Sequence, residues 1–109
     1  MSKIDRVRAA LAGEEVARVP FSVWYHFGLQ HASAEQVARA HLEFFDAYDL
    51  DWLKVMNDYA YPIPSGIEPV GEVDDLDHVS ALDVTEGAMG EQLKVIQLVA
   101  EGLRGRALL

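Results

Sequence analysis

The spacing of hydrophobic positions changes along the chain, and it begins with a helical pattern. Ile4, Val7 and Leu11 follow one another at intervals of three and four residues, which places them on one face of a helix. Ser2 is a good N-cap residue, and Gly13 suits the position just after a helix C-terminus. The pattern therefore predicts a first helix between Ser2 and Gly13.

Two later segments have the composition of buried strands. Residues 21–26, which follow Pro20, are rich in aromatic and β-branched types and carry bulky side chains on both faces. A strand that is covered on both sides, as in a parallel sheet, tolerates that pattern. We predict a second strand over residues 52–56, after a turn at residues 49–51.

A second helix is predicted between the two strands. Ser33 begins it, and Gln36 stands at the capping-box position three residues on. Its apolar face consists of Val37, His41, Phe44, Phe45 and Tyr48, and we interpret His41 as a packed core histidine. A strand, a helix and a second strand with a short return make a βαβ unit, with parallel strands and a right-handed crossover.

The rest of the chain is divided between a long loop and a third helix. Residues 57–84 are rich in proline and glycine, and we interpret their acidic run Glu72–Asp77 as a solvated, mobile face. One short extended piece fits residues 67–73. From about residue 85 to residue 103 we predict a helix that is apolar around most of its circumference, which indicates burial on two sides. Gly102 and Gly105 are expected to break it, and Ala107–Leu109 looks like the beginning of a strand.

Composition and charge narrow the expected partners. The 109 residues carry a formal net charge of −9 and include no cysteine. Nucleic acids and anionic membrane surfaces attract Lys and Arg, so we expect neither as a partner. Without cysteine there are no disulfides or thiolate metal sites, and no segment approaches the apolar length of a membrane span. We predict no metal or cofactor, and a cytoplasmic location because no signal-peptide core follows Met1.

Several segments occur in an order and at a spacing that resemble the uroporphyrinogen decarboxylase superfamily. Arg18–Trp24 is similar to the beginning of that superfamily's barrel, and Asp51–Met56 is similar to its second strand. Residues 6–14 look like its N-terminal helix and loop, and residues 103–106 look like the end of the helix before the next strand. The superfamily includes corrinoid-dependent methyltransferases and builds an eight-stranded (β/α) barrel, a fold that needs roughly 200 residues or more.

The resemblance implies an α/β fold, a partial (β/α)8 TIM barrel that makes up one partial domain. Residues 1–19 would be the N-terminal helix and turn, residues 20–56 the βαβ unit, residues 57–84 the long loop, and residues 85–109 the last helix and a truncated strand. Two barrel strands cannot close, so we expect the N-terminal part of a longer protein. The implied parent activity is decarboxylation of a tetrapyrrole or a related methyl transfer, with the chain alone inactive.

The same resemblance implies that Asp58 is catalytic. The superfamily places an aspartate just after the second strand, where it accepts hydrogen bonds from pyrrole N–H groups, and Asn57 and Asp58 match that position. The simpler alternative is an aspartate that caps a turn. Residues 24–30 contain no arginine, although the superfamily has an arginine-bearing loop there and a carboxylate-rich substrate needs arginine forks.

Five further residues join Asn57 in the predicted substrate-binding set. His26 and Tyr25 line the pocket, and His26 either donates to a substrate carboxylate and takes part in acid–base chemistry, or is a hydrogen-bonded histidine at a strand end. Lys54 is either a cation inside the barrel or a side chain that snorkels to water. Trp24 is expected mostly in the core, and Tyr59 belongs to an aromatic lip over a flat macrocycle or simply pins the loop.

Two rival hypotheses remain open. In the first, the chain is a free-standing, non-catalytic binding or structural module that oligomerises through its open sheet edge and the apolar helix over residues 85–103. In the second, partial barrels oligomerise into a complete enzyme. The expected partners are a tetrapyrrole-like small molecule if the barrel is completed, together with further copies of the chain or the remainder of the barrel.

Overall fold

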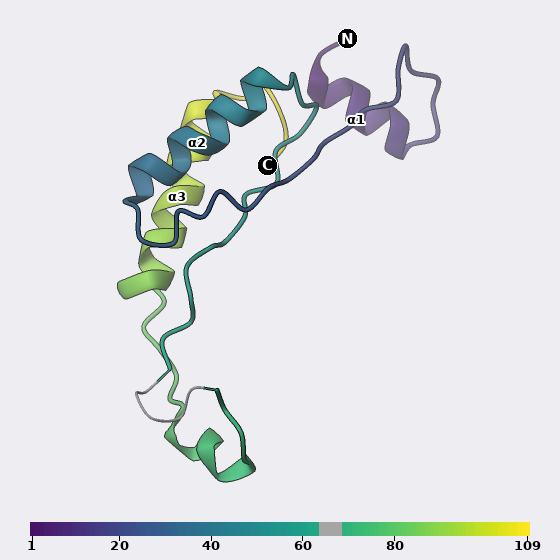
Figure 1. Ribbon diagram of the computed structural model, residues 1–109. Helices are drawn as coiled ribbons and strands as arrows, with labels where there is room; N and C mark the ends of the chain where they lie inside the picture. Colours follow the sequence, from purple (N-terminus) through teal and green to yellow (C-terminus); the bar gives the residue numbers. More distant parts are fainter. Residues whose placement is uncertain (64–68) are drawn as a thin grey trace.

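The computed structural model describes residues 1–63 and 69–109, and its regular elements are helices (Figure 1). They are α1 (Lys3–Leu11), α2 (Ala34–Ala47), the 3-10 helix η1 (Val73–His78) and α3 (Gly87–Leu103). Within these ranges no β-sheet forms, and strand-type pairing is limited to one isolated parallel bridge between Trp52 and Leu108. The fold is therefore all-helical, with long irregular connections.

The predicted α/β fold, a partial TIM barrel with a βαβ unit over residues 20–56, is wrong. Residues 21–26 and 51–56 do approach each other, but among the described residues they share a single backbone hydrogen bond, from Asp51 N–H to Phe21 O (2.9 Å). A strand depends on a ladder of such bonds, and two strands alone are marginal in water. Residues 21–26 also lack cover, since Trp24 and Tyr25 are 55% and 62% exposed.

The predicted helix starts are confirmed at both serine caps. Ser2 and Ser33 each accept a hydrogen bond from the backbone N–H three residues on, and the side chains of Asp5 and Gln36 accept one from the cap's own N–H in return. After α1, Gly13 adopts a φ of 74°, a left-handed conformation that glycine takes without strain. Local signals thus fix where these helices begin and where α1 ends.

α2 and α3 pack against each other and hold the core of the molecule. Residues from the segment after α2 and from the C-terminus complete it. The core consists of Ala34, Val37, Ala38, Phe45, Leu50, Leu53, Val95, Val99, Leu103 and Ala107. His41 is also buried, and its Nδ1 donates to Val37 O (2.8 Å) while its Nε2 accepts from Met56 N–H (3.1 Å). The interpretation of His41 as a core histidine is confirmed.

α3 is covered on one side only. Val95, Val99 and Leu103 are buried in the core shared with α2, whereas Leu93 and Ile96 are 49% and 39% exposed. The second apolar face that the sequence predicts is therefore present but uncovered. Within the described residues, no helix combines the length and the apolar run that crossing a bilayer requires.

The end of α3 differs from the prediction at Gly102. This glycine lies inside the helix, where a Cβ atom would come within 2.3 Å of the Leu42 side chain on α2. Gly102 is therefore a point of close packing between two helices. The helix ends at Leu103, as predicted, and is capped by Arg104, whose φ of 50° is left-handed.

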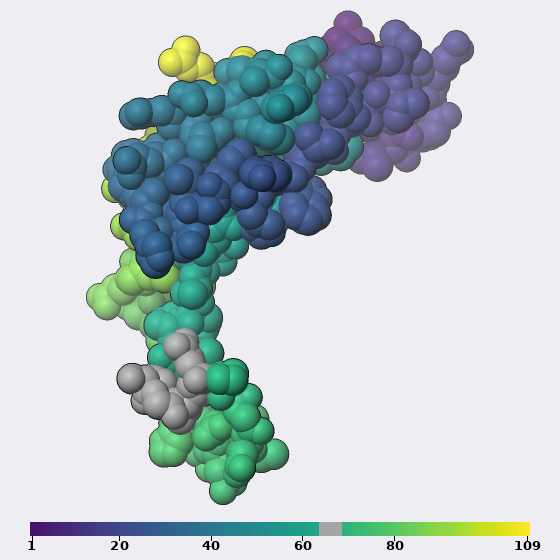
Figure 2. All heavy atoms as spheres, viewed as in Figure 1, coloured from purple at the N-terminus to yellow at the C-terminus, as the bar shows by residue number. Residues whose placement is uncertain are grey.

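The molecule is elongated, with principal extents of 54 × 29 × 22 Å (Figures 1 and 2). Its Cα radius of gyration is 17.9 Å, whereas a compact domain of about 100 residues has a value of roughly 13 Å. An arm around η1, green in Figure 2, projects from the α2–α3 pair, and α1 lies at the other end of the molecule. The chain therefore exposes more surface than a compact domain of its length.

The acidic run Glu72–Asp77 is solvated, as predicted, but it folds into most of η1. The carboxylate of Asp75 accepts hydrogen bonds from the backbone N–H groups of Glu72 and Gly71 (3.0 and 2.9 Å), and these bonds hold the pKa of Asp75 below its ordinary value. The extended piece predicted over residues 67–73 falls partly on residues 64–68, which lie outside the described residues.

Candidate functional site

The candidate site lies where the segment before α2 passes the segment after it, and Asp51 organises this region. The Asp51 side chain is fully buried, and its carboxylate accepts hydrogen bonds from Arg6, Arg18 and the Phe21 N–H. Burial raises the pKa of Asp51, but the bonds from Phe21, Arg18 and Arg6 together lower it by more, so the pKa lies below its ordinary value. Asp51 therefore ties α1 and residues 18–21 to the turn after α2.

Farther along the same two segments, His26 meets Asp58. The imidazole Nδ1 lies within hydrogen-bond distance of Asp58 Oδ1. The Asp58 side chain is 11% exposed and that of His26 is 58% exposed, so the carboxylate is sheltered while the ring reaches solvent. A carboxylate at Nδ1 orients an imidazole and leaves Nε2 free to bind a ligand or exchange a proton.

Trp24 and Lys54 lie next to this pair and add an aromatic face and a positive charge. The rings of Trp24 and His26 are nearly perpendicular, with centroids 5.8 Å apart. Lys54 Nζ lies 4.7 Å from the centroid of the Trp24 ring, a cation–π contact. We refer to His26, Asp58, Trp24 and Lys54 as the His–Asp cluster.

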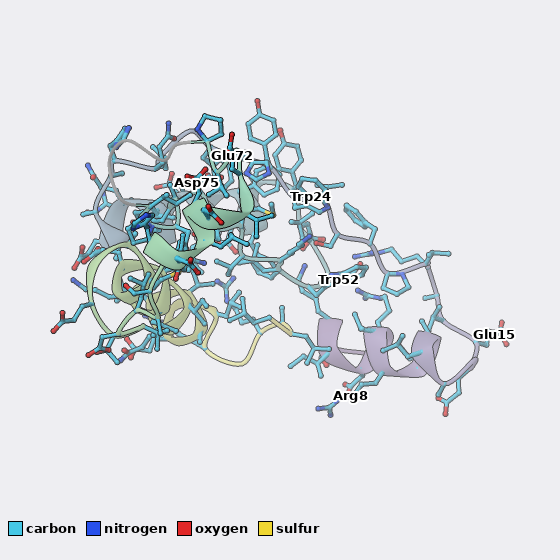
Figure 3. All side chains as sticks on the ribbon, turned by 90° about the horizontal axis from the view of Figure 1, so that it is seen from below. Arg8, Glu15, Trp24, Trp52, Glu72 and Asp75 are labelled. Atoms are coloured by element: carbon cyan, nitrogen blue, oxygen red, sulfur yellow. The ribbon has the colours of Figure 1, made fainter. Side chains whose placement is uncertain are left out.

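The position of Trp24 departs from the sequence interpretation. The sequence predicts it mostly in the core, but the residue is more than half exposed. Figure 3 shows Trp24 and Trp52 on the irregular segments between α1 and the α2–α3 pair. Because no sheet covers this segment in the described residues, the ring stays at the surface, where a ligand can reach it.

Two further predicted residues lie beside the cluster without joining it. The Tyr25 ring packs edge-on against Phe27, with centroids 5.8 Å apart, and remains largely exposed. Asn57 Oδ1 accepts a hydrogen bond from Tyr59 N–H (3.0 Å), which forms a local turn just after the second segment. Asn57 thus fixes the path of the backbone.

Tyr59 holds the loop that follows Asp58 against the approach to α2. Its hydroxyl donates a hydrogen bond to Ala32 O (3.1 Å), at the approach to α2. Burial, followed by the negative charges of Glu91 and Glu35, raises the pKa of Tyr59 above its ordinary value. The hydroxyl therefore stays protonated at neutral pH and acts as a structural donor.

An open apolar groove of about 460 Å³ lies between α1, residues 19–20, Trp52 and the C-terminal Leu108–Leu109. No residue of the His–Asp cluster lines it, so the groove and the candidate chemistry are separate features. In the described part of the chain, no three His, Asp or Glu side chains stand close enough to hold a metal ion. The cluster itself offers an imidazole, a carboxylate, an ammonium group and an aromatic face.

The chain matches no protein-family model, no curated protein and no solved structure. The resemblance to the uroporphyrinogen decarboxylase superfamily therefore rests on the chain's own motifs. The barrel strands that the superfamily would place at these motifs do not form in the described residues.

Sequence reasoning missed three residues that organise this region, namely Arg6, Arg18 and Asp51. Asp51 carries a signal that could have revealed it, because it stands between Leu50 and an apolar segment, and a buried carboxylate needs cationic partners. The arginines carry no such signal. Their contacts with Asp51 span 45 and 33 positions of sequence, and no local pattern predicts a pairing at that separation.

Proposed function

We propose that the chain is part of a uroporphyrinogen decarboxylase-like protein and supplies binding residues for a tetrapyrrole-like small molecule. The parent activity is decarboxylation of a tetrapyrrole or a related methyl transfer. The observation that carries the proposal is the contact between His26 and Asp58, which are 32 positions apart in sequence. Each of the two residues follows one of the two segments that resemble the superfamily by two positions, and the family resemblance assigns Asp58 to the substrate.

The chemistry of the His–Asp cluster suits a flat ligand that carries N–H donors and acidic groups. Asp58 Oδ2 is buried and has no hydrogen-bond partner among the described residues, and a pyrrole N–H would satisfy it once the Asp58 side chain turns outward. The exposed ring of Trp24 offers a surface for stacking, and Lys54 offers a positive charge to a carboxylate. These features support binding of a tetrapyrrole-like ligand.

We expect the chain alone to bind its ligand without turnover. A substrate with several carboxylates needs arginine forks, and Arg6 and Arg18 are both engaged by Asp51. Decarboxylation also replaces a carboxylate with a proton as CO2 leaves, so it needs a proton donor held against the reacting carbon. His26 is too open to water to provide an enclosed donor of that kind.

Calorimetric titration of the chain with uroporphyrinogen, without oxygen, tests the proposal. We expect saturable binding that Asp58→Asn weakens roughly tenfold, because a hydrogen bond to a charged group contributes about 1.5 kcal/mol or more. Asp74→Asn is the matched control, since it removes the same charge from the exposed surface of η1 and should leave the affinity unchanged. The proposal fails if the ligand does not bind, or if Asp58→Asn binds it as tightly as the wild type.

Self-association as a non-catalytic module is a second candidate function, and the uncovered face of α3 favours it. Leu93 and Ile96 are exposed on a helix whose other side packs on α2, and large exposed apolar surfaces are typical of interaction sites. The occupant that fits is a second copy of the chain, whose α3 would cover the same residues across a two-fold axis. Association through an open sheet edge is no longer part of this hypothesis, because the described residues form no sheet. Association through α3 remains.

Light scattering across a concentration series tests the second candidate. Leu93→Glu places a charge in the proposed interface and is expected to convert an oligomer to monomer. Gln30→Glu adds the same charge at an exposed loop position and is the matched control. A wild-type chain that stays monomeric throughout the series would rule out self-association and leave the ligand-binding proposal untouched.

A further inference from the structure

We infer that Asp51 is the positioning residue of the His–Asp cluster. Two hydrogen bonds join Asp51 to the backbone of Phe21. Asp51 N–H donates to Phe21 O, and the Asp51 carboxylate accepts from Phe21 N–H, both at 2.9 Å. One residue on, the Ser22 hydroxyl donates to Trp52 O (2.8 Å). These bonds set residue 21 beside residue 51, and residue 22 beside residue 52.

The pairing set here fixes the point from which the two segments run on to the His–Asp cluster. His26 follows Phe21 by five positions, and Asp58 follows Asp51 by seven. An extended chain advances roughly 3.3 Å per residue, so five residues carry the effect up to roughly 16 Å from Asp51. A shift of one residue along an extended segment would displace a side chain by about 3.3 Å, which is enough to break the His26–Asp58 hydrogen bond.

The two arginines prevent such a slip. Arg18 contacts both carboxylate oxygens of Asp51, at 2.5 and 3.1 Å, and Arg6 contacts Oδ1 at 2.5 Å. Because the Asp51 side chain is fully buried, moving it away from its partners would leave an unpaired charge inside the molecule, which is strongly unfavourable. The cluster is thus held by a charged anchor that shares no residue with it. The inference rests on the proposed function only for what the cluster binds.

A simpler role for Asp51 would be to tether α1 without influence on the cluster. The two roles separate in a double-mutant cycle that is read at the His26 ring by NMR of histidine labelled with ¹⁵N, with no ligand present. Asp58→Asn is made once in the wild-type chain and once in an Asp51→Asn chain. In each background the shift of the His26 ring nitrogens reports whether Asp58 contacts the ring.

We expect Asp58→Asn to move the His26 ring signals in the wild-type background, and most of that shift to be lost in the Asp51→Asn background. Asp46→Asn is the matched control, because it removes a surface charge whose partner, Arg106, is not part of the anchor. In that background the full shift should remain. An equal shift in the wild-type and Asp51→Asn backgrounds would overturn the inference, because Asp51 would then be a tether only.

Far-UV circular dichroism shows whether the helices survive Asp51→Asn. If they do not, the same cycle is run with Arg18→Gln, which alters a partly exposed residue and leaves the hydrogen bond from Phe21 to Asp51 in place. A reduced shift in that background supports the inference, and an undiminished shift overturns it. Because no ligand is present, a failure of tetrapyrrole binding and a failure of this inference are distinguishable.

Discussion

At the scale of single residues, Asp51 and His41 are the two polar residues of the described structure that are buried as a whole. Burial of a polar group is costly unless hydrogen bonds or opposite charges satisfy it. His41 is satisfied through one backbone partner at each ring nitrogen, whereas Asp51 draws its partners from α1, the segment before residue 21 and the backbone of Phe21. The first residue stabilises the core, and the second joins parts of the chain that no helix contact connects.

The lowered pKa of Asp51 predicts a loss of stability in acid. Because the folded chain binds this proton more weakly than the unfolded chain, the stabilisation is complete above the unfolded pKa of about 4 and is lost as pH falls through the lower folded pKa. We expect Asp51→Asn to be less stable than the wild type at neutral pH. Between about pH 5 and about pH 3 its free energy of unfolding should fall less steeply.

Urea unfolding of both chains at several pH values measures this difference. Asp49→Asn provides the comparison, since the pKa of Asp49 is also lowered, chiefly by its hydrogen bond with Lys3, but this carboxylate lies at the surface. A variant at Asp49 should retain the acid response that Asp51 supplies. Parallel acid profiles for the wild type and Asp51→Asn would show that Asp51 does not contribute in this way.

At the scale of elements, the helices depend on local signals. The Ser33 side chain accepts a hydrogen bond from Gln36 N–H and so completes a capping box at the start of α2. Ser33→Ala is expected to lower the free energy of unfolding by about 1 kcal/mol, because the Gln36 N–H in the first turn of α2 loses its acceptor. Thermal or urea unfolding measures the change, and Ser80→Ala, at an exposed position outside the helices, should have little effect.

The contrast between correct helices and wrong strands has a physical cause. A helix satisfies its own backbone within a few residues, so caps such as Ser2 and Ser33 and a periodic apolar face are enough to predict it. A strand satisfies its backbone only through a neighbour, and residues 21–26 and 52–56 find too few partners to form a ladder. Their aromatic and β-branched composition favours β-strands, but strands do not form there.

In the candidate site, too, the residues with local signals could be predicted and the long-range contacts could not. Asp58 could be proposed because the resemblance points to its position, and His26 because it stands at the end of the predicted first strand; the structure brings the two side chains together. Asn57 and Tyr59 are local, and they hold the loop in place. The anchor of Asp51 with Arg6 and Arg18 could not be predicted, because it joins residues from three separate parts of the chain.

At the scale of the whole molecule, the elongated shape leaves functional groups at the surface. The radius of gyration of 17.9 Å, the arm around η1 and the exposed face of α3 describe a chain that buries little around its irregular segments. The His–Asp cluster is consequently open, with Trp24 and His26 both accessible. An open cluster can bind a ligand, but it gives little protection from water to a reaction.

The most direct test of the central claim is an NMR titration of histidine-labelled chain with uroporphyrinogen, without oxygen. The chain has four histidines, and they act as internal references for one another. We predict that the ring signals of His26 shift to saturation, while those of the buried His41 and of the exposed His31 and His78 do not. Unchanged His26 signals at saturating ligand, or equal shifts at all four histidines, would contradict a ligand site at His26 and Asp58.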